Sequence, residues 1–104
     1  MKLADLFKEL GGSQNKLERI VRYHGKDAMT TIAIEEMAEV IKAITKIKRY
    51  GLTDEYKTDL EEEVADALIC ITELIMMGYV DISHVKDWQH LKINREIKRI
   101  RENK

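Results

Sequence analysis

The chain has 104 residues, and its 18 basic and 19 acidic side chains give a formal net charge of −1. This length predicts a single domain over residues 1–104, and the balanced charge argues against a nucleic-acid-binding protein, which would carry a basic excess. Because 44% of the residues are hydrophobic, we expect a folded rather than a disordered chain.

The first two predicted helices are bounded by glycines, in a chain that contains no proline. The first begins at a cap on Ser13 and runs to about His24. The second begins at Asp27 or Thr30 and ends near residue 50, where Gly51 is a left-handed stop.

A third helix is predicted from Thr53 or Asp54 to about Met77. A competing capping box, Thr58 with Glu61, leaves its start open. The turn before this helix is only a few residues long, so the second and third helices should pack as antiparallel neighbours.

A fourth helix is predicted to begin at Asp81 or Ser83 and to run close to the last residue. No segment alternates with period two for long enough to form a strand. We therefore expect an all-α protein, a helical bundle built on the antiparallel two-helix hairpin.

The third helix is apolar on nearly all sides, which predicts burial on more than one side. Its apolar residues are Leu60, Val64, Ala65, Leu68, Ile69, Ile71, Ile75 and Met76. Three other short helices do not cover such a surface, so we expect oligomerisation, to at least a dimer, to complete the bundle.

The two hairpin helices share a pattern of acids, since Glu35–Ile47 and Glu62–Leu74 agree in residue type at most positions. On a helical wheel Glu36 lies inside the apolar arc of its helix, and Glu63 does the same in the other. Glu39 lies about 60° from Glu36, and Asp66 lies about 60° from Glu63. A carboxylate in an apolar stripe is unfavourable unless its charge is compensated.

A hairpin register that places Glu39 opposite Asp66 brings Glu36 and Glu63 within about one turn of them. Four carboxylates this close cannot all stay ionised alone, and oxygen ligands favour Mg²⁺ or Mn²⁺ over zinc. The sequence thus predicts a divalent-metal site. The remaining acids on these helices, Glu61, Glu73 and Glu35, are interpreted as solvent-facing.

The pattern Glu35-Glu36-x-x-Glu39, followed later by Glu63-x-x-Asp66, resembles the MazG-like all-α nucleoside triphosphate pyrophosphohydrolases, in particular short, phage-type single-domain members. The resemblance runs from about residue 32 to the end of the chain. It implies that Glu36, Glu39, Glu63 and Asp66 are metal ligands and that Glu35 is an accessory acid.

The same resemblance implies hydrolysis of (deoxy)nucleoside triphosphates to a nucleoside monophosphate and pyrophosphate, by attack of a metal-activated water on the α-phosphorus. Mg²⁺ or Mn²⁺ would be the cofactor. Either Glu35 or Glu39 could accept the proton of the water.

The final helix carries a basic face, on which Trp88, Lys92, Arg95 and Arg99 are spaced i, i+4, i+7 and i+11. Lys92 and Arg95 match basic positions of the family's final helix, which implies contacts with phosphate oxygens. A solvated basic face is the alternative, favoured for Arg99. Trp88 is interpreted as a core or interface residue.

Several weaker signals are given structural interpretations. Arg19, Tyr23 and His24 precede the second helix and could approach a nucleotide base, and Cys70 is explained as a small buried residue. A single cysteine, no apolar run near ~20 residues and no signal-peptide core together predict a cytoplasmic protein that does not bind membranes.

Two other functions are weighed. A ferritin-like di-iron protein needs Glu-x-x-His on two helices, whereas Asp81-x-x-His84 and Asp87-x-x-His90 both lie on the last helix. A non-catalytic helical oligomer, a regulatory or scaffold module that retains the metal site, is the alternative that stays open.

Overall fold

The computed structural model describes residues 2–103, which form five α-helices and no strand. The helices are α1 (Leu3–Gly12), α2 (Gln14–His24), α3 (Lys26–Tyr50), α4 (Asp54–Met76) and α5 (Ile82–Glu102). The all-α prediction is confirmed. Helix α1 was not predicted, and its last turn contains the glycine pair Gly11 and Gly12.

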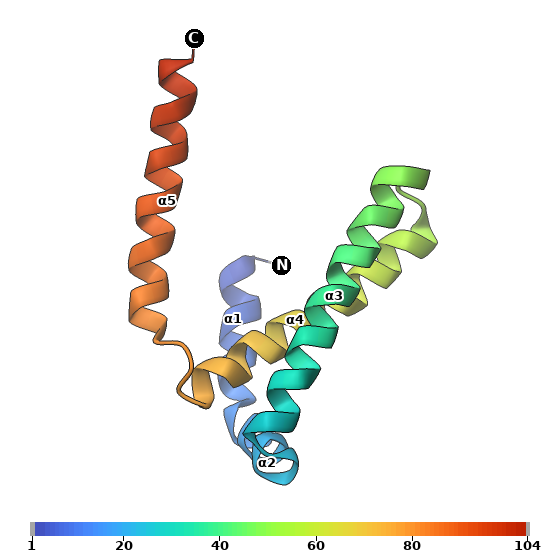
Figure 1. Ribbon diagram of the computed structural model, residues 1–104, viewed down its shortest axis with the longest axis vertical. Helices are drawn as coiled ribbons and strands as arrows, with labels where there is room; N and C mark the ends of the chain where they lie inside the picture. Colours follow the sequence, from blue (N-terminus) through green and yellow to red (C-terminus); the bar gives the residue numbers. More distant parts are fainter. Residues whose placement is uncertain (1, 104) are drawn as a thin grey trace.

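Helices α3 and α4 form the predicted antiparallel hairpin, which is the main packing unit of the protein (Figure 1). Gly51, at φ 94°, ends α3 in a backbone region that favours glycine. Thr53 then caps α4, since its hydroxyl accepts a hydrogen bond of 3.1 Å from the backbone N–H of Tyr56. The competing start at Thr58 is excluded, because that hydroxyl donates to the carbonyl of Asp54 within the helix.

Helix α3 begins earlier than predicted, at Lys26, because Gly25 at φ 85° both ends α2 and opens α3. Thr30 does not cap this helix. Its hydroxyl donates to the carbonyl of Lys26 at 2.7 Å, which is the back-bonding typical of a residue inside a helix. Ser13 likewise donates to the carbonyl of Glu9 instead of capping α2.

Helix α2 packs across the end of the hairpin that lies away from the turn, where it contacts both α3 and α4 (Figure 1). The buried apolar residues gather where these helices meet, and they are Leu17, Met29, Ala33, Ala43, Ala67, Cys70 and Met77. The core is small, since no large side chain among residues 2–103 is completely buried.

Helix α5 stands apart from the rest of the chain (Figure 1). Asp81, one of the two predicted starts, caps it by accepting a hydrogen bond of 2.9 Å from the backbone N–H of Ser83. None of its residues is buried, and Trp88 is 57% exposed, so Trp88 is not a core residue of this protomer.

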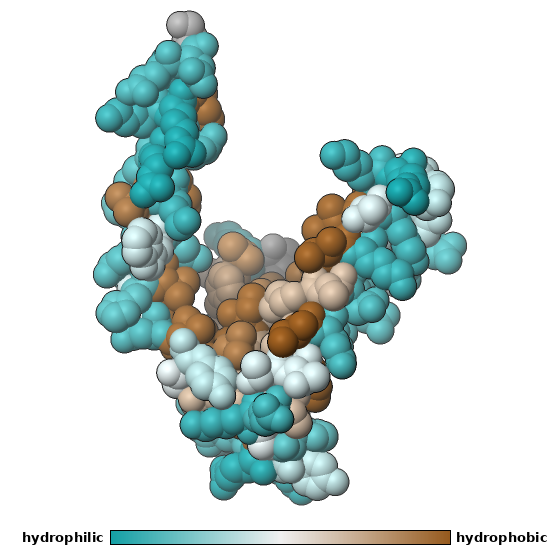
Figure 2. Space-filling model, in the orientation of Figure 1, coloured by the Kyte–Doolittle hydropathy of each residue, from teal (hydrophilic) through white to brown (hydrophobic). Residues whose placement is uncertain are grey.

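Apolar side chains gather around the open space between α5 and the hairpin (Figure 2). The large hydrophobic residues of α3 and α5 that are more than half exposed are Ile34, Ile41, Ile44, Tyr50, Ile82, Trp88, Ile93 and Ile100. No helix within residues 2–103 is both long enough and apolar enough to cross a membrane.

Candidate active site

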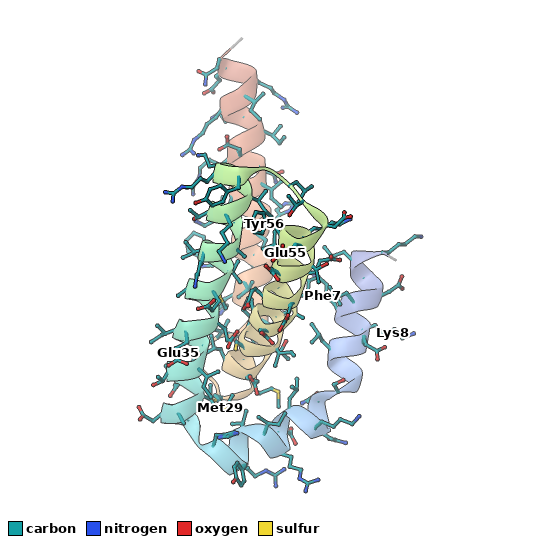
Figure 3. The ribbon with its side chains drawn as sticks, turned by 90° about the vertical axis from the view of Figure 1, so that its right-hand side faces the viewer. Phe7, Lys8, Met29, Glu35, Glu55 and Tyr56 are labelled. Atoms are coloured by element: carbon teal, nitrogen blue, oxygen red, sulfur yellow. The ribbon has the colours of Figure 1, made fainter. Side chains whose placement is uncertain are left out.

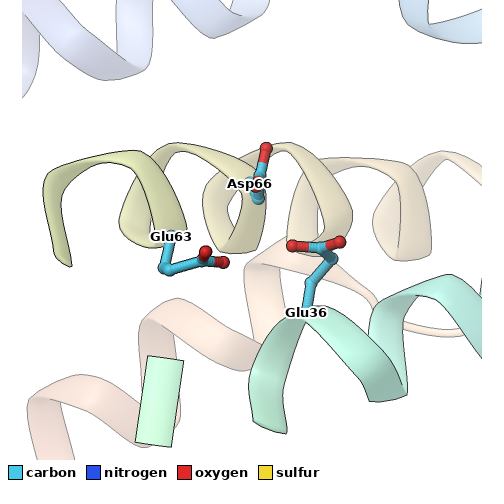
Figure 4. A group of neighbouring side chains, drawn as sticks. All are labelled: Glu36, Glu63 and Asp66. Atoms are coloured by element: carbon cyan, nitrogen blue, oxygen red, sulfur yellow. The ribbon is translucent and has the colours of Figure 1, made fainter. Parts of the chain in front are cut away.

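The middle of the hairpin holds a cluster of three acids, Glu36 from α3 with Glu63 and Asp66 from α4 (Figure 4). One carboxyl oxygen of each lies within 4.8 Å of the others, and all three residues are half-buried. Sequence reasoning had named all three. The cluster is a group that could hold a metal ion.

The fourth predicted ligand, Glu39, is exposed and lies outside this group of three oxygens. The expected register paired Glu39 with Asp66, whereas the structure brings Glu36 within 4.8 Å of Asp66. Glu39 lies close enough to the cluster for its negative charge to contribute to the raised pKa values of Glu36 and Glu63.

The cluster is electrostatically unfavourable without a cation. Burial raises the pKa of Glu36 above its ordinary value, and the carboxyl of Asp66 raises it further by repulsion and by a hydrogen bond. Burial and the charge of Asp66 also raise the pKa of Glu63. Oε2 of Glu63 is buried and has no hydrogen-bond partner in the described chain. An orphaned carboxylate oxygen facing two other carboxyl groups is suited to a hard cation.

A polar groove extends from the cluster toward the hairpin turn and has a volume of about 100 Å³. Its acids are Glu39, Asp59, Glu62 and Glu63, and its other polar residues are Lys42, Lys46 and Tyr56. Tyr56 marks the position of the groove near the turn (Figure 3).

Lys42 and Lys46 are candidate site residues that sequence reasoning missed. The sequence spacing could have identified them. Lys42 follows Glu39 by three residues and Lys46 follows Lys42 by four, so the three side chains lie on one side of the helix.

A second pocket, of about 200 Å³, adjoins the cluster on the side of α2. Glu36 and Asp66 belong to the cluster and also line this pocket. Its apolar lining residues are Ile20, Met29, Ile32 and Ile69, and Met29 marks its position at the end of the hairpin away from the turn (Figure 3).

The second pocket is also lined by His24, Cys70 and Glu73. Cys70 is buried, as expected, and burial raises the pKa of its thiol to about 11. Glu73 contradicts the sequence interpretation of a solvent-facing acid, because it is only 2% exposed. The solvent-facing interpretation was wrong because α2 packs over this side of α4.

The remaining predicted residues lie outside the cluster. Glu35 is exposed on the outer side of α3 (Figure 3), in agreement with the expectation that it faces solvent. Lys92 and Arg95 are exposed on α5 and line neither of the two pockets beside the cluster. Arg99 pairs with Glu96 at 3.4 Å on the same helix, which supports the solvated interpretation of that residue.

Comparison with known proteins gives one match. The family model described as the MazG nucleotide pyrophosphohydrolase domain matches residues 24–100, which include the acidic cluster and both adjoining pockets apart from Ile20. No curated protein and no solved structure matches the chain significantly.

Proposed function

The chain belongs to the MazG nucleotide pyrophosphohydrolase family, and from that premise we propose that it hydrolyses nucleoside triphosphates to a nucleoside monophosphate and pyrophosphate. The observation that carries this proposal is the group of three half-buried carboxyl oxygens within 4.8 Å of one another. Oxygen donors of this kind favour Mg²⁺ or Mn²⁺ as the cofactor.

Glu36, Glu63 and Asp66 would hold the metal, and Glu39 would be a fourth ligand. Glu39 lies one helical turn after Glu36 and lines the polar groove together with Glu63. A divalent cation bound there would neutralise phosphate charge and make a coordinated water more acidic.

Glu39 is also the better candidate for the group that accepts the proton of the attacking water. It lines the groove beside Glu63, whereas Glu35 faces away from it. A general base must lie within hydrogen-bond reach of the proton that it accepts, and Glu39, unlike Glu35, lines the groove that begins at the cluster.

Lys42 and Lys46 would bind the pyrophosphate part of the substrate. Both line the groove that extends from the cluster, so a triphosphate whose α-phosphate lies at the cluster would extend its other phosphates toward them. Ammonium groups bind phosphate oxygens as mobile point charges.

Lys92 and Arg95 would reach the phosphates of a bound substrate only in an oligomer. Within one protomer α5 makes no extensive contact with the hairpin, yet it exposes a row of large apolar residues. An apolar groove on α3, lined by Ala33, Ile34, Met37, Ala38 and Ile41, is also uncovered. We infer that a second copy covers these surfaces and that its basic helix face approaches the phosphates.

A cytosolic location is part of this proposal, since nucleoside triphosphates are abundant there and Cys70 is a free thiol.

The experiment is a product analysis across nucleoside triphosphates, with Mg²⁺ or Mn²⁺ and with chelator. The expected products are a nucleoside monophosphate and pyrophosphate, formed only when metal is present. Release of orthophosphate with a diphosphate would contradict the proposal, because it places the attack at the γ-phosphorus. No product from any nucleotide would favour the non-catalytic oligomer.

A further inference from the structure

Glu73 is the only buried charged side chain among residues 2–103. It is 2% exposed, and its Oε2 atom has no hydrogen-bond partner in the described chain. Buried polar atoms in proteins nearly always have a partner, so an orphaned carboxyl oxygen requires an explanation. The metal cluster does not provide one, because Glu73 is not among its three acids.

The pocket that Glu73 lines is suited to an organic ring. Apolar side chains of Ile20, Met29, Ile32 and Ile69 line it, and a few polar groups join them. This combination is typical of small-molecule sites, in which apolar walls hold the ligand and one or two polar groups fix its orientation.

The position of Glu73 relative to the cluster fits a nucleotide. Glu73 follows Asp66 by two helical turns, so both side chains lie on one face of α4 and their Cα atoms are about 10 Å apart along the axis. That separation is close to the span from the α-phosphate to the far edge of the base in an extended nucleotide. Asp66 lines both the cluster and the pocket.

We propose that this pocket holds the base of the substrate and that Glu73 selects bases with an exocyclic amino group over those with a carbonyl at the same place. The proposal rests on the function proposed above and names the substrate class of the same site. A carboxyl group accepts a hydrogen bond from an amino N–H in either of its protonation states. When Glu73 is ionised, a carbonyl oxygen at that place would meet a second acceptor, and it would leave the buried oxygen of Glu73 unpaired.

The other titratable groups at the pocket are His24, Cys70, Glu36 and Asp66. Burial raises the pKa of Glu73, and the charge of the nearby His24 opposes that effect. No hydrogen bond or ion pair joins His24 to Glu73 in the described chain, so Oε2 of Glu73 is still without a partner.

The test uses nucleotide pairs that carry an amino group or a carbonyl at the same ring position, dCTP against dUTP and dATP against dITP. In each pair the adjoining ring nitrogen changes as well, from an acceptor to an N–H donor. For the base size that the enzyme accepts, we expect kcat/KM for pyrophosphate release to favour the amino base by at least about 10-fold. Glu73→Gln should lower that preference about 10-fold or more, because an amide can turn its NH₂ group toward a carbonyl. Glu61→Gln, an exposed change on the same helix, should leave the preference unchanged.

The ratio of kcat/KM for the amino base to kcat/KM for the carbonyl base distinguishes base selection from a general loss of activity. A merely structural role of Glu73 would lower kcat/KM for both members of a pair equally. An unchanged ratio in Glu73→Gln, or a wild-type ratio near one or in favour of the carbonyl base, would overturn the inference while hydrolysis still stands.

Calorimetric binding of the non-hydrolysable α,β-imido analogues of the same pairs separates this inference from the proposed function. If no nucleotide is hydrolysed but the amino analogue binds more tightly and Glu73→Gln removes the difference, the pocket assignment holds and the proposed reaction fails. If neither analogue binds, the pocket assignment fails as well.

Discussion

The carboxyl oxygens of Glu36 on α3 and Asp66 on α4 lie within 4.8 Å of each other, although both residues are negatively charged when ionised. Like charges at this distance in a half-buried setting repel strongly. The α3–α4 packing nevertheless holds them together and adds Glu63 to the group. Such an arrangement is expected where a cation supplies the missing positive charge.

The first prediction concerns metal-linked stability. Mg²⁺ or Mn²⁺ should raise the melting temperature of the wild-type protein, because a ligand that binds only the folded state stabilises it. Glu36→Gln and Glu63→Gln should each weaken metal affinity by about 10-fold or more, since even an outer partner of a metal ligand has an effect of that size. Thermal melts with metal and with chelator measure this. Glu61→Gln is the control, and a full metal-induced shift in Glu36→Gln would show that Glu36 is not a ligand.

The second prediction concerns pH in the metal-free protein. The pKa of Glu36 is raised in the folded state above its ordinary value of 4.5, so the folded protein retains that proton to higher pH than the unfolded chain does. Ionisation of Glu36 therefore destabilises the fold as pH rises above about 4.5, and the unfavourable contribution is complete once pH exceeds the folded pKa. Glu36→Gln should have little effect near pH 4 and should become progressively stabilising toward pH 7. A stability difference that stays constant over this range would contradict the assignment.

The third prediction concerns the buried carboxyl of Glu73. Replacing it with methionine, which has a similar shape and no buried charge, should stabilise the apo-protein at pH 7 by about 1–3 kcal/mol, the typical penalty of an unsatisfied buried polar group. Urea denaturation measures the change. Glu61→Met, at an exposed position, should change stability by no more than about 0.5 kcal/mol. A destabilised Glu73→Met protein would mean that the carboxylate has a partner that compensates its burial.

The fourth prediction concerns self-association. Light scattering at micromolar concentration should give a mass that is a multiple of the 12.2 kDa chain. Ile97→Glu places a charge among the apolar residues of α5 and should raise the dissociation constant at least about 10-fold, whereas Gln89→Glu on the same helix should not. A wild-type mass near 12.2 kDa with stable helix content would rule out the proposed assembly.

The hairpin and three members of its acidic cluster were predictable from the sequence. The stop at Gly51 and the cap at Thr53 are local signals, so the turn between the two hairpin helices could be located within a few residues. The placement of Glu36 and Glu63 inside apolar stripes depends only on helical periodicity. Once two such helices are joined by a short turn, their antiparallel packing follows, although the group that forms is Glu36 with Glu63 and Asp66, without Glu39.

Features that depend on a third element were not predictable in the same way. Glu73 was taken to face solvent because a wheel of α4 alone does not show that α2 packs over its end. The start of α3 was placed at Asp27 or Thr30, both later than Lys26, because these residue types are good caps in general. Here the hydroxyl of Thr30 bonds back within the helix. The sequence pattern shows only that one face of α5 is apolar. It does not show that this helix stands apart from the others within the protomer.

The most direct test of the central claim follows the oxygen of the attacking water. Hydrolysis of an accepted nucleoside triphosphate in ¹⁸O-labelled water with Mg²⁺ is followed by mass spectrometry of both products. Attack at the α-phosphorus predicts one labelled oxygen in the nucleoside monophosphate and none in the pyrophosphate. Label in the pyrophosphate, or labelled orthophosphate beside a nucleoside diphosphate, would contradict it.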